Sequence, residues 1–457
     1  MVIKKIMNHN FYENSFERGT ILLIISQIVF FVSSYVVHVV AANTVSPIDY
    51  GRFGVVMGIL SIVYIFLSTA LPESATKYIS EGRDQKAVTK IILTYQLLFS
   101  LLLSFLIYFS ADYISDFLND KELTKYIRIL SILIPVRAIL HVYRGVFNGL
   151  AYFSISSSIS IFNSLLKLLF SLILLFLGYK ITGLLLGYIS AAFLALIASF
   201  VIFRRVPYKG EKQISSSTLL SFAFPLIFFT FCFNILLNID IIILKYMLEN
   251  PNEVGYYNSV KAISSVILGL GMAISNTLLP TVSKIKETGS RKDVEIQINN
   301  LFSYLIIFLL PICAFISVNS QNLINLFFPE EYEAASSTLS ILVFAVGFLS
   351  LLIILGSIFN GLGKPKIPLY VSLSILPLYF FMSYRLVSLL GFNGIALASL
   401  ASNVLAVFFL YMMIKKEYTL HLFSKHNFLF LLVNIIIYLI LFFLSLEIFH
   451  LILFSVL

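Results

Sequence analysis

The stretch SLLKLLFSLILLFLG, residues 164–178, is almost continuously apolar. Its apolar side chains do not alternate with polar ones, as they would in the strands of a membrane β-barrel. The α-helix is the other structure that satisfies every backbone polar group inside a lipid bilayer. The stretch therefore predicts a transmembrane helix, and this helix carries one cation, Lys167.

The whole chain has the same apolar character. Of its 457 residues, 59% are hydrophobic and 12% are charged, and the mean hydropathy is +0.98, far above the value of a soluble domain. Apolar runs of about 20 residues, long enough to cross a hydrocarbon core of about 30 Å, follow one another along the sequence. We predict an all-α polytopic membrane protein of about 13 (roughly 12 to 14) transmembrane helices. The expected spans lie near residues 19–42, 54–72, 88–110, 128–150, 155–178, 181–203, 217–245, 255–279, 297–319, 336–360, 367–390, 394–414 and 427–447.

The basic residues indicate how the chain is oriented in the membrane. About 19 of the 31 lysines and arginines fall in one set of predicted loops, against roughly six in the opposite loops. Cytoplasmic loops carry this excess, so we expect the amino terminus to be cytoplasmic and the protein to lie in the cell membrane. The net charge of +9 is dispersed over many short loops, which argues against a nucleic-acid partner.

One tetrapeptide occurs twice. FNGL stands at residues 147–150 and again at 359–362, each time at the end of a predicted span, and weaker matches such as residues 178–191 with 391–403 share nearly the same offset. We therefore predict two parallel six-helix repeats, in which Gly149 and Gly361 let the chain leave the helix. The predicted domains are a lobe at 1–203, a cytoplasmic linker at 204–216, a second lobe at 217–414 and an additional transmembrane segment at 415–457.

Two longer segments carry a family resemblance. Residues 46–80 (SPIDYGRFGVVMGILSIVYIFLSTALPESATKYIS) and residues 238–285, which begin NIDIIILKYMLENPNEVGYYN, resemble the polysaccharide-exporter, or oligosaccharide flippase, branch of the multidrug/oligosaccharidyl-lipid/polysaccharide (MOP) transporter superfamily. The resemblance implies two six-helix bundles in a V around a central cavity. It also implies transfer of a polyprenyl-linked oligosaccharide from the cytoplasmic to the outer leaflet.

Polar side chains at membrane depth are the candidate binding residues. Arg137, His141, Arg144 and Asn148 follow one another at spacings of four, three and four residues, which places them on one helix face. A cation at the bilayer centre costs about 2.5 to 3.5 kcal/mol on insertion scales, so it needs a partner or a hydrated cavity. The other candidate substrate-binding cations are Lys167, Lys261 and Arg385. Snorkelling to the interface or structural pairing is the alternative role for each.

The two repeats differ in charge. At an offset of 212 residues, Arg137 corresponds to Leu349 and Lys167 corresponds to Tyr379, so only the first lobe holds these cations. A cationic cavity suits an anionic ligand, and guanidinium groups suit phosphate because they form paired, charge-assisted hydrogen bonds. The sequence therefore favours a lipid (pyro)phosphate headgroup as the ligand.

Acidic residues at depth are scarce. Asp240 and Glu73 are the candidates for coupling to H⁺ or Na⁺, and pairing with a nearby cation or asparagine is the alternative for Asp240. We expect no catalytic residue, metal or cofactor. The function favoured is a lipid-linked oligosaccharide flippase acting by alternating access, with membrane lipids and polysaccharide-assembly proteins as partners. A drug/cation antiporter of the same superfamily and a membrane glycosyltransferase or ligase are the alternatives.

Overall fold

The structure is a computed structural model that describes residues 16–68, 70–206, 216–288, 291–304, 309–364 and 366–419, together with residues 432, 433 and 436. Nearly all of the described chain is helical, as the sequence predicts. Apart from residues 432, 433 and 436, the predicted span at 427–447 lies outside the described residues. Contacts between backbone positions divide the chain into two compact units, Met1–Tyr246 and Met247–Leu457.

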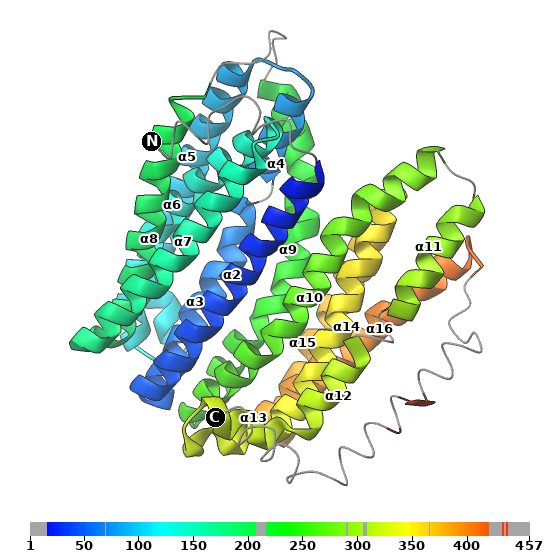
Figure 1. Cartoon of the computed structure of the whole chain (residues 1–457). Helices are drawn as coiled ribbons and strands as arrows, with labels where there is room; N and C mark the ends of the chain where they lie inside the picture. Colours follow the sequence, from blue (N-terminus) through cyan, green and yellow to red (C-terminus); the bar gives the residue numbers. More distant parts are fainter. Residues whose placement is uncertain are drawn as a thin grey trace, which may run out of the picture. The chain divides into compact units, whose positions relative to one another are not determined.

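The first unit is built from long helices (Figure 1). Its close-packed pairs are α5 with α6, α7 with α8, α2 with α7, and α6 with α8. The helices are α2 (Phe16–Thr44), α3 (Pro47–Ser68), α4 (Ala70–Ser80), α5 (Gln85–Phe117), α6 (Glu122–Gly149), α7 (Phe153–Leu174), the π-helical turn η2 (Leu175–Tyr179), α8 (Lys180–Phe203) and α9 (Ser216–Met247). The predicted span at 54–72 is wrong at both ends, because α3 begins seven residues earlier and the chain enters α4 at Ala70.

The second unit centres on α14, which packs against both α10 and α16, while α15 packs against α16. Its helices are α10 (Asn252–Thr288), α11 (Arg291–Tyr304), α12 (Leu310–Val318), α13 (Ser320–Phe327), the short 3₁₀ turn η4 (Glu330–Ala335), α14 (Ser336–Gly361), α15 (Lys366–Leu390) and α16 (Phe392–Lys415). Between α12 and α13 the chain bends by 72°.

The described helices fit a membrane protein that crosses the bilayer several times. Within the described residues, seven continuous helical stretches are long and apolar enough to span a bilayer, or up to eight if the bent α12–α13 pair is one span. The α7–α8 hairpin, Phe153–Phe203, counts as one of these stretches. The exact number of 13 spans stays a prediction.

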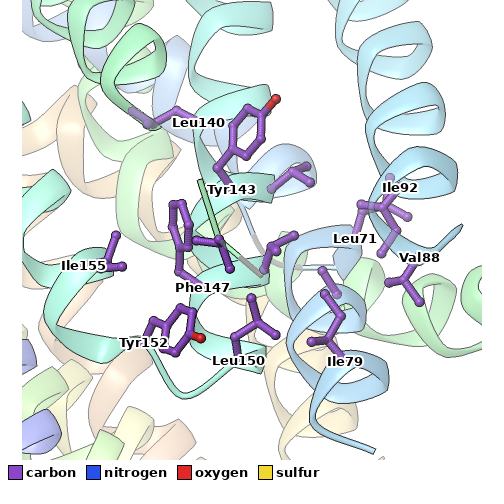
Figure 2. Packing of buried hydrophobic residues seen from close by; sticks show 14 of the residues in the cluster. Leu71, Ile79, Val88, Ile92, Leu140, Tyr143, Phe147, Leu150, Tyr152 and Ile155 are labelled. Atoms are coloured by element: carbon purple, nitrogen blue, oxygen red, sulfur yellow. The ribbon is translucent and has the colours of Figure 1, made fainter. Parts of the chain in front are cut away.

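A buried apolar cluster holds α4, α5, α6 and α7 together (Figure 2). Phe147, the first residue of the first FNGL, is fully buried in this cluster, which also includes Ile79 of α4 and Ile155 of α7. Phe359, the first residue of the second FNGL, is also buried, in the second unit. The aromatic residue of the motif is therefore a packing residue in both places.

The two FNGL motifs end their helices with the same backbone geometry. After the first, the amide of Tyr152 donates to the carbonyl of Phe147 at 2.8 Å; after the second, the amide of Lys364 donates to the carbonyl of Phe359 at 2.8 Å. This is the Schellman pattern of a helix C-terminus. The residue that turns the chain has a positive φ in each case, 60° at Ala151 and 72° at Gly363.

This geometry corrects the predicted role of the motif glycines. The positive φ lies two residues after Gly149 and Gly361, and both glycines are the last residues of their helices. At Gly149 the absence of a side chain matters for packing instead, because a Cβ there would lie 2.9 Å from the carbonyl oxygen of Thr76 on α4. The glycine thus permits close approach of α4 to α6.

A second pair of turns also shares one backbone feature between the two predicted repeats. The chain turns with positive φ at Gly178, where α7 and η2 lead into α8, and at Gly391, between α15 and α16. These glycines begin the segments that the sequence aligned at 178–191 and 391–403. The local backbone therefore supports a repeated hairpin, while the placement of one repeat against the other stays a prediction.

Candidate functional site

Helix α6 carries the predicted polar face through the first unit. Pro135 lies inside the helix and removes the amide that would bond to the carbonyl of Ser131. The hydroxyl of Ser104 on α5 donates to that carbonyl instead, at 2.7 Å. The helix therefore continues past the proline and presents Arg137 and the polar residues that follow it.

Arg137 is partly buried and lies against two aromatic rings. Its guanidinium carbon Cζ is 5.2 Å from the ring centroid of Tyr64 on α3 and 5.7 Å from that of Tyr188 on α8. Both distances fall within the range of cation–π attraction. The charge is thus held by rings from two neighbouring helices.

Lys167 on α7 lies in a matching environment. The side chain is only 2% exposed, and its ammonium Nζ donates to the hydroxyl Oγ of Ser34 on α2 at 2.6 Å. The same ammonium is 4.7 Å from the ring centroid of Phe30 and 5.4 Å from that of Tyr188. Tyr188 therefore touches both cations.

His141 completes this group. Its ring Nε2 is hydrogen-bonded to the hydroxyl of Tyr64, and the two rings meet edge to face with centroids 5.0 Å apart. Tyr64 therefore contacts Arg137 and His141 at once. We call the five residues Arg137, His141, Lys167, Tyr64 and Tyr188 the cationic site.

The cationic site holds no counter-charge within the described chain. Among the described residues, neither Arg137 nor Lys167 forms an ion pair with a carboxylate. Burying a charged side chain without an oppositely charged partner costs on the order of several kcal/mol. The aromatic rings and the serine hydroxyl that contact these two cations offset only part of that cost. The site is therefore suited to bind an anion.

Arg144 and Asn148 continue the same helix face beyond the cationic site. The Arg144 nitrogen Nε and the Asn148 oxygen Oδ1 are buried and have no hydrogen-bond partner among the described residues. Polar atoms of this kind normally find a partner when buried. Arg144 and Asn148 thus add an unfilled donor and an unfilled acceptor along α6.

The other predicted residues lie on other helices. Lys261 on α10 is partly buried and Arg385 on α15 is exposed, and both belong to the second unit. Glu73 is exposed on α4. Asp240 is 7% exposed on α9, where its Oδ1 accepts from the amide of Ile241 at 2.8 Å. Neither carboxylate forms an ion pair with Arg137 or Lys167, so the structure does not join them to the cationic site.

The sequence reasoning missed Tyr64, Tyr188 and Ser34. With 25 tyrosines in the chain, the residue type alone cannot single out two of them. The comparison of repeats does not single them out either. At the offset of 212 residues Tyr188 corresponds to Leu400, but other tyrosines of the first lobe also correspond to residues without a ring, such as Tyr126 to Thr338. The two rings are therefore found only from the packing of α3 and α8 against α6.

A separate ionic network surrounds Asp120, between α5 and α6. Its carboxylate accepts from Arg52 Nε at 2.9 Å and from Lys245 Nζ at 2.7 Å, while Asp49 pairs with Arg52 at 3.2 Å and lies 3.8 Å from Lys180. Burial alone would raise the pKa of Asp120, but the hydrogen bonds from Arg52 and Lys245 hold this pKa below its ordinary value. These basic residues of the predicted outer loops are therefore structural.

Comparison with known proteins agrees with the fold and the predicted superfamily. A family model described as polysaccharide biosynthesis protein matches residues 16–286, more than half of the chain, and one described as MatE matches residues 225–385. An uncharacterized membrane protein of Methanocaldococcus jannaschii, MJ1068, is 22% identical over 360 residues, which make up 73% of this chain and 71% of that protein.

Solved structures show the same fold. The lipid II flippase MurJ in an inward closed conformation is similar with a TM-score of 0.77 and 16% identity, over 94% of this chain and 93% of that chain. An inward-facing multidrug resistance MATE family transporter of the MOP superfamily has a TM-score of 0.70 and 14% identity, over 87% of this chain and 98% of that chain. From these matches and the helical architecture, the chain belongs to the polysaccharide biosynthesis protein family, within the MOP transporter superfamily.

Proposed function

We propose that the protein is a flippase for a polyprenyl-(pyro)phosphate-linked oligosaccharide. It moves the headgroup from the cytoplasmic to the outer leaflet of the cell membrane by alternating access, for the assembly of a surface polysaccharide or glycan. The observation that carries the proposal is the pair of cations, Arg137 and Lys167, which have rings and a hydroxyl as partners where a carboxylate would be expected.

The chemistry of the cationic site suits the phosphate part of such a substrate. The planar guanidinium of Arg137 can bind two phosphate oxygens at once, and the ammonium of Lys167 adds a point charge. Attraction to these two positive charges offsets the free-energy cost of removing water from the phosphate. The prenyl chain remains among the lipid tails. The polar atoms of Arg144 and Asn148 continue along α6, where the first sugar can donate and accept hydrogen bonds.

The test is transfer of a labelled lipid in proteoliposomes. We would reconstitute the full chain with a fluorescent polyprenyl-diphosphate-linked disaccharide and follow its loss from the inner leaflet by quenching with dithionite added outside. Lys167→Met should reduce the transfer rate by about tenfold or more. Loss of about 1.4 kcal/mol of binding free energy between the site and the phosphate corresponds to a factor of ten. Its melting temperature should not fall, since an apolar residue replaces a buried charge that has no counter-ion.

Lys125→Met is the matched control. This lysine is exposed near the start of α6 and is not part of the cationic site, so the same change of residue type there should leave transfer close to that of the wild type. Wild-type rates for Lys167→Met, or a loss of transfer explained by loss of folded protein, would contradict the proposed role of the site.

Ion coupling is part of the proposal. Asp240 is a buried carboxylate on α9, and the MatE match begins at residue 225 on the same helix. A charge moved across 100 mV corresponds to about 2.3 kcal/mol, enough to bias a transport cycle. Asp240→Asn should therefore make transfer insensitive to an imposed H⁺ or Na⁺ gradient while headgroup binding persists. A wild-type rate that ignores both gradients and the membrane potential would remove the coupling role.

The second candidate function is an ion-coupled drug/cation antiporter, which the MatE match favours. A cationic drug needs an anionic site, whereas the described site presents Arg137 and Lys167. Gradient-driven uptake of a cationic dye by the same proteoliposomes would favour this candidate over the flippase.

A further inference from the structure

Tyr188 is the one ring that the two cations of the described site share. Arg137 also lies over Tyr64, and Lys167 also lies over Phe30, but only Tyr188 contacts both, at 5.7 Å and 5.4 Å. The ring is 4% exposed, so it is fixed by its surroundings. One neighbour is the buried ring of Phe53 on α3, edge to face at 6.2 Å between centroids.

The shared ring solves an electrostatic problem. Two cations on α6 and α7 repel each other, and among the described residues neither forms an ion pair with a carboxylate. The face of an aromatic ring carries partial negative charge and attracts a cation without neutralising it. Tyr188 can therefore hold both charges near one point and leave them available to a ligand.

The ring, and not the hydroxyl, is the group in position to act. No hydrogen bond of the Tyr188 hydroxyl is found among the described residues, whereas both cation contacts are with the ring. A buried tyrosine with only a structural role would be expected to form a hydrogen bond through its hydroxyl.

We propose that Tyr188 is a positioning residue that sets the placement of Arg137 relative to Lys167, so that a headgroup with two linked phosphates binds in preference to one with a single phosphate. Each phosphate then meets one cation. The inference rests on the proposed function and deepens it by assigning the site a diphosphate specificity.

The experiment measures binding of two probes to the purified full chain in nanodiscs. The probes are geranylgeranyl diphosphate and geranylgeranyl monophosphate, which share one prenyl chain. The wild type should bind the diphosphate more tightly. Tyr188→Leu should reduce that preference about tenfold, the size expected when a desolvated cation–π contact is lost, and Tyr188→Phe, which keeps the ring, should reduce it by less than about twofold.

A graded series keeps the test valid if Tyr188→Leu does not fold. Phenylalanine with one, two or three ring fluorines, inserted at position 188, keeps the shape of the ring and progressively weakens its negative face. The diphosphate preference should fall in step with fluorination, an effect that a structural role would not produce. The same series at Phe200 is the control, because this ring on the same helix lies 4.3 Å from Arg204 and outside the cationic site. There the preference should not change.

The outcomes separate the two proposals. A wild type that binds neither probe contradicts the proposed function and this inference with it. A wild type that prefers the diphosphate while the fluorinated series at position 188 leaves that preference unchanged contradicts the role of Tyr188 alone. An equal loss in Tyr188→Phe and Tyr188→Leu would assign the effect to the hydroxyl and overturn the inference.

Discussion

At the scale of single residues, the buried and partly buried basic side chains of the first unit are of two kinds: some are paired with a carboxylate and others are not. Lys245 and Arg52 are held by Asp120, so their charges are compensated and structural. Lys167 and Arg137 are held by rings and a hydroxyl, so their charges stay available. A basic residue inside the membrane therefore indicates a ligand site only when it is not paired with a carboxylate. The sequence alone does not show whether such a pair exists.

The Asp120 network gives a pH prediction. Because Arg52 and Lys245 lower the pKa of Asp120 in the folded protein, its carboxylate stabilises the fold at pH values above about 4, the ordinary range of an aspartate. This stabilisation is lost as the pH falls through the lowered pKa. Asp120→Asn should therefore lower the melting temperature at pH 7, and the gap from the wild type should narrow on acidification below about pH 4.

The measurement is the melting temperature of the purified wild type and Asp120→Asn at a series of pH values. Arg128→Gln is a suitable comparison, since the Arg128–Asp112 pair is exposed and should contribute little at any pH. A gap between wild type and Asp120→Asn that stays constant down to pH 3 would count against the assigned ion pairs.

At the scale of elements, the sequence predicted most helices well because each long apolar run must form its own helix in a membrane. The predicted span at 336–360 is α14 to within a residue, and 217–245 is α9 to within two. The boundary of α3 was wrong because Asp49 and Arg52 made its first turn look like a loop, whereas ion pairs to Lys180 and Asp120 allow these residues within the helix. Such pairs depend on the tertiary structure, so the local pattern could not reveal them.

The FNGL helix ends carry a prediction about backbone strain. Ala151 adopts φ 60°, where an L-residue with a side chain is disfavoured by about 1 kcal/mol, and Gly363 takes the corresponding position at no such cost. Ala151→Gly should therefore raise the free energy of unfolding by about 1 kcal/mol, and Gly363→Ala should lower it by a similar amount. Unfolding of both variants by denaturant in detergent would measure this, and a shift of the same sign in both would refute the shared C-terminal geometry.

At the scale of the whole molecule, the chain combines similar helix ends with dissimilar charges. Matched turns occur at Ala151 and Gly363 and at Gly178 and Gly391, whereas the positions 212 residues after Arg137 and Lys167 hold Leu349 and Tyr379. The repeated parts supply the fold, and the parts that differ supply the site. The sequence therefore located the cations from their position within apolar spans, and comparison of the repeats showed that the second lobe has neutral residues at the matching positions. Their aromatic partners needed the packing of α3, α7 and α8 against α6.

The most direct measurement of the central claim, that the first unit recognises an anionic lipid headgroup, compares two lipids in the same proteoliposomes. One is a polyprenyl-diphosphate-linked disaccharide, and the other carries the same disaccharide on an uncharged lipid with a chain of equal length. We expect the wild type to transfer the diphosphate-linked sugar at least about tenfold faster than the sugar on the uncharged lipid. The double variant Arg137→Gln, Lys167→Met should transfer the two lipids at equal rates. Equal transfer of both lipids by the wild type, or a difference that persists in the double variant, would contradict the central claim.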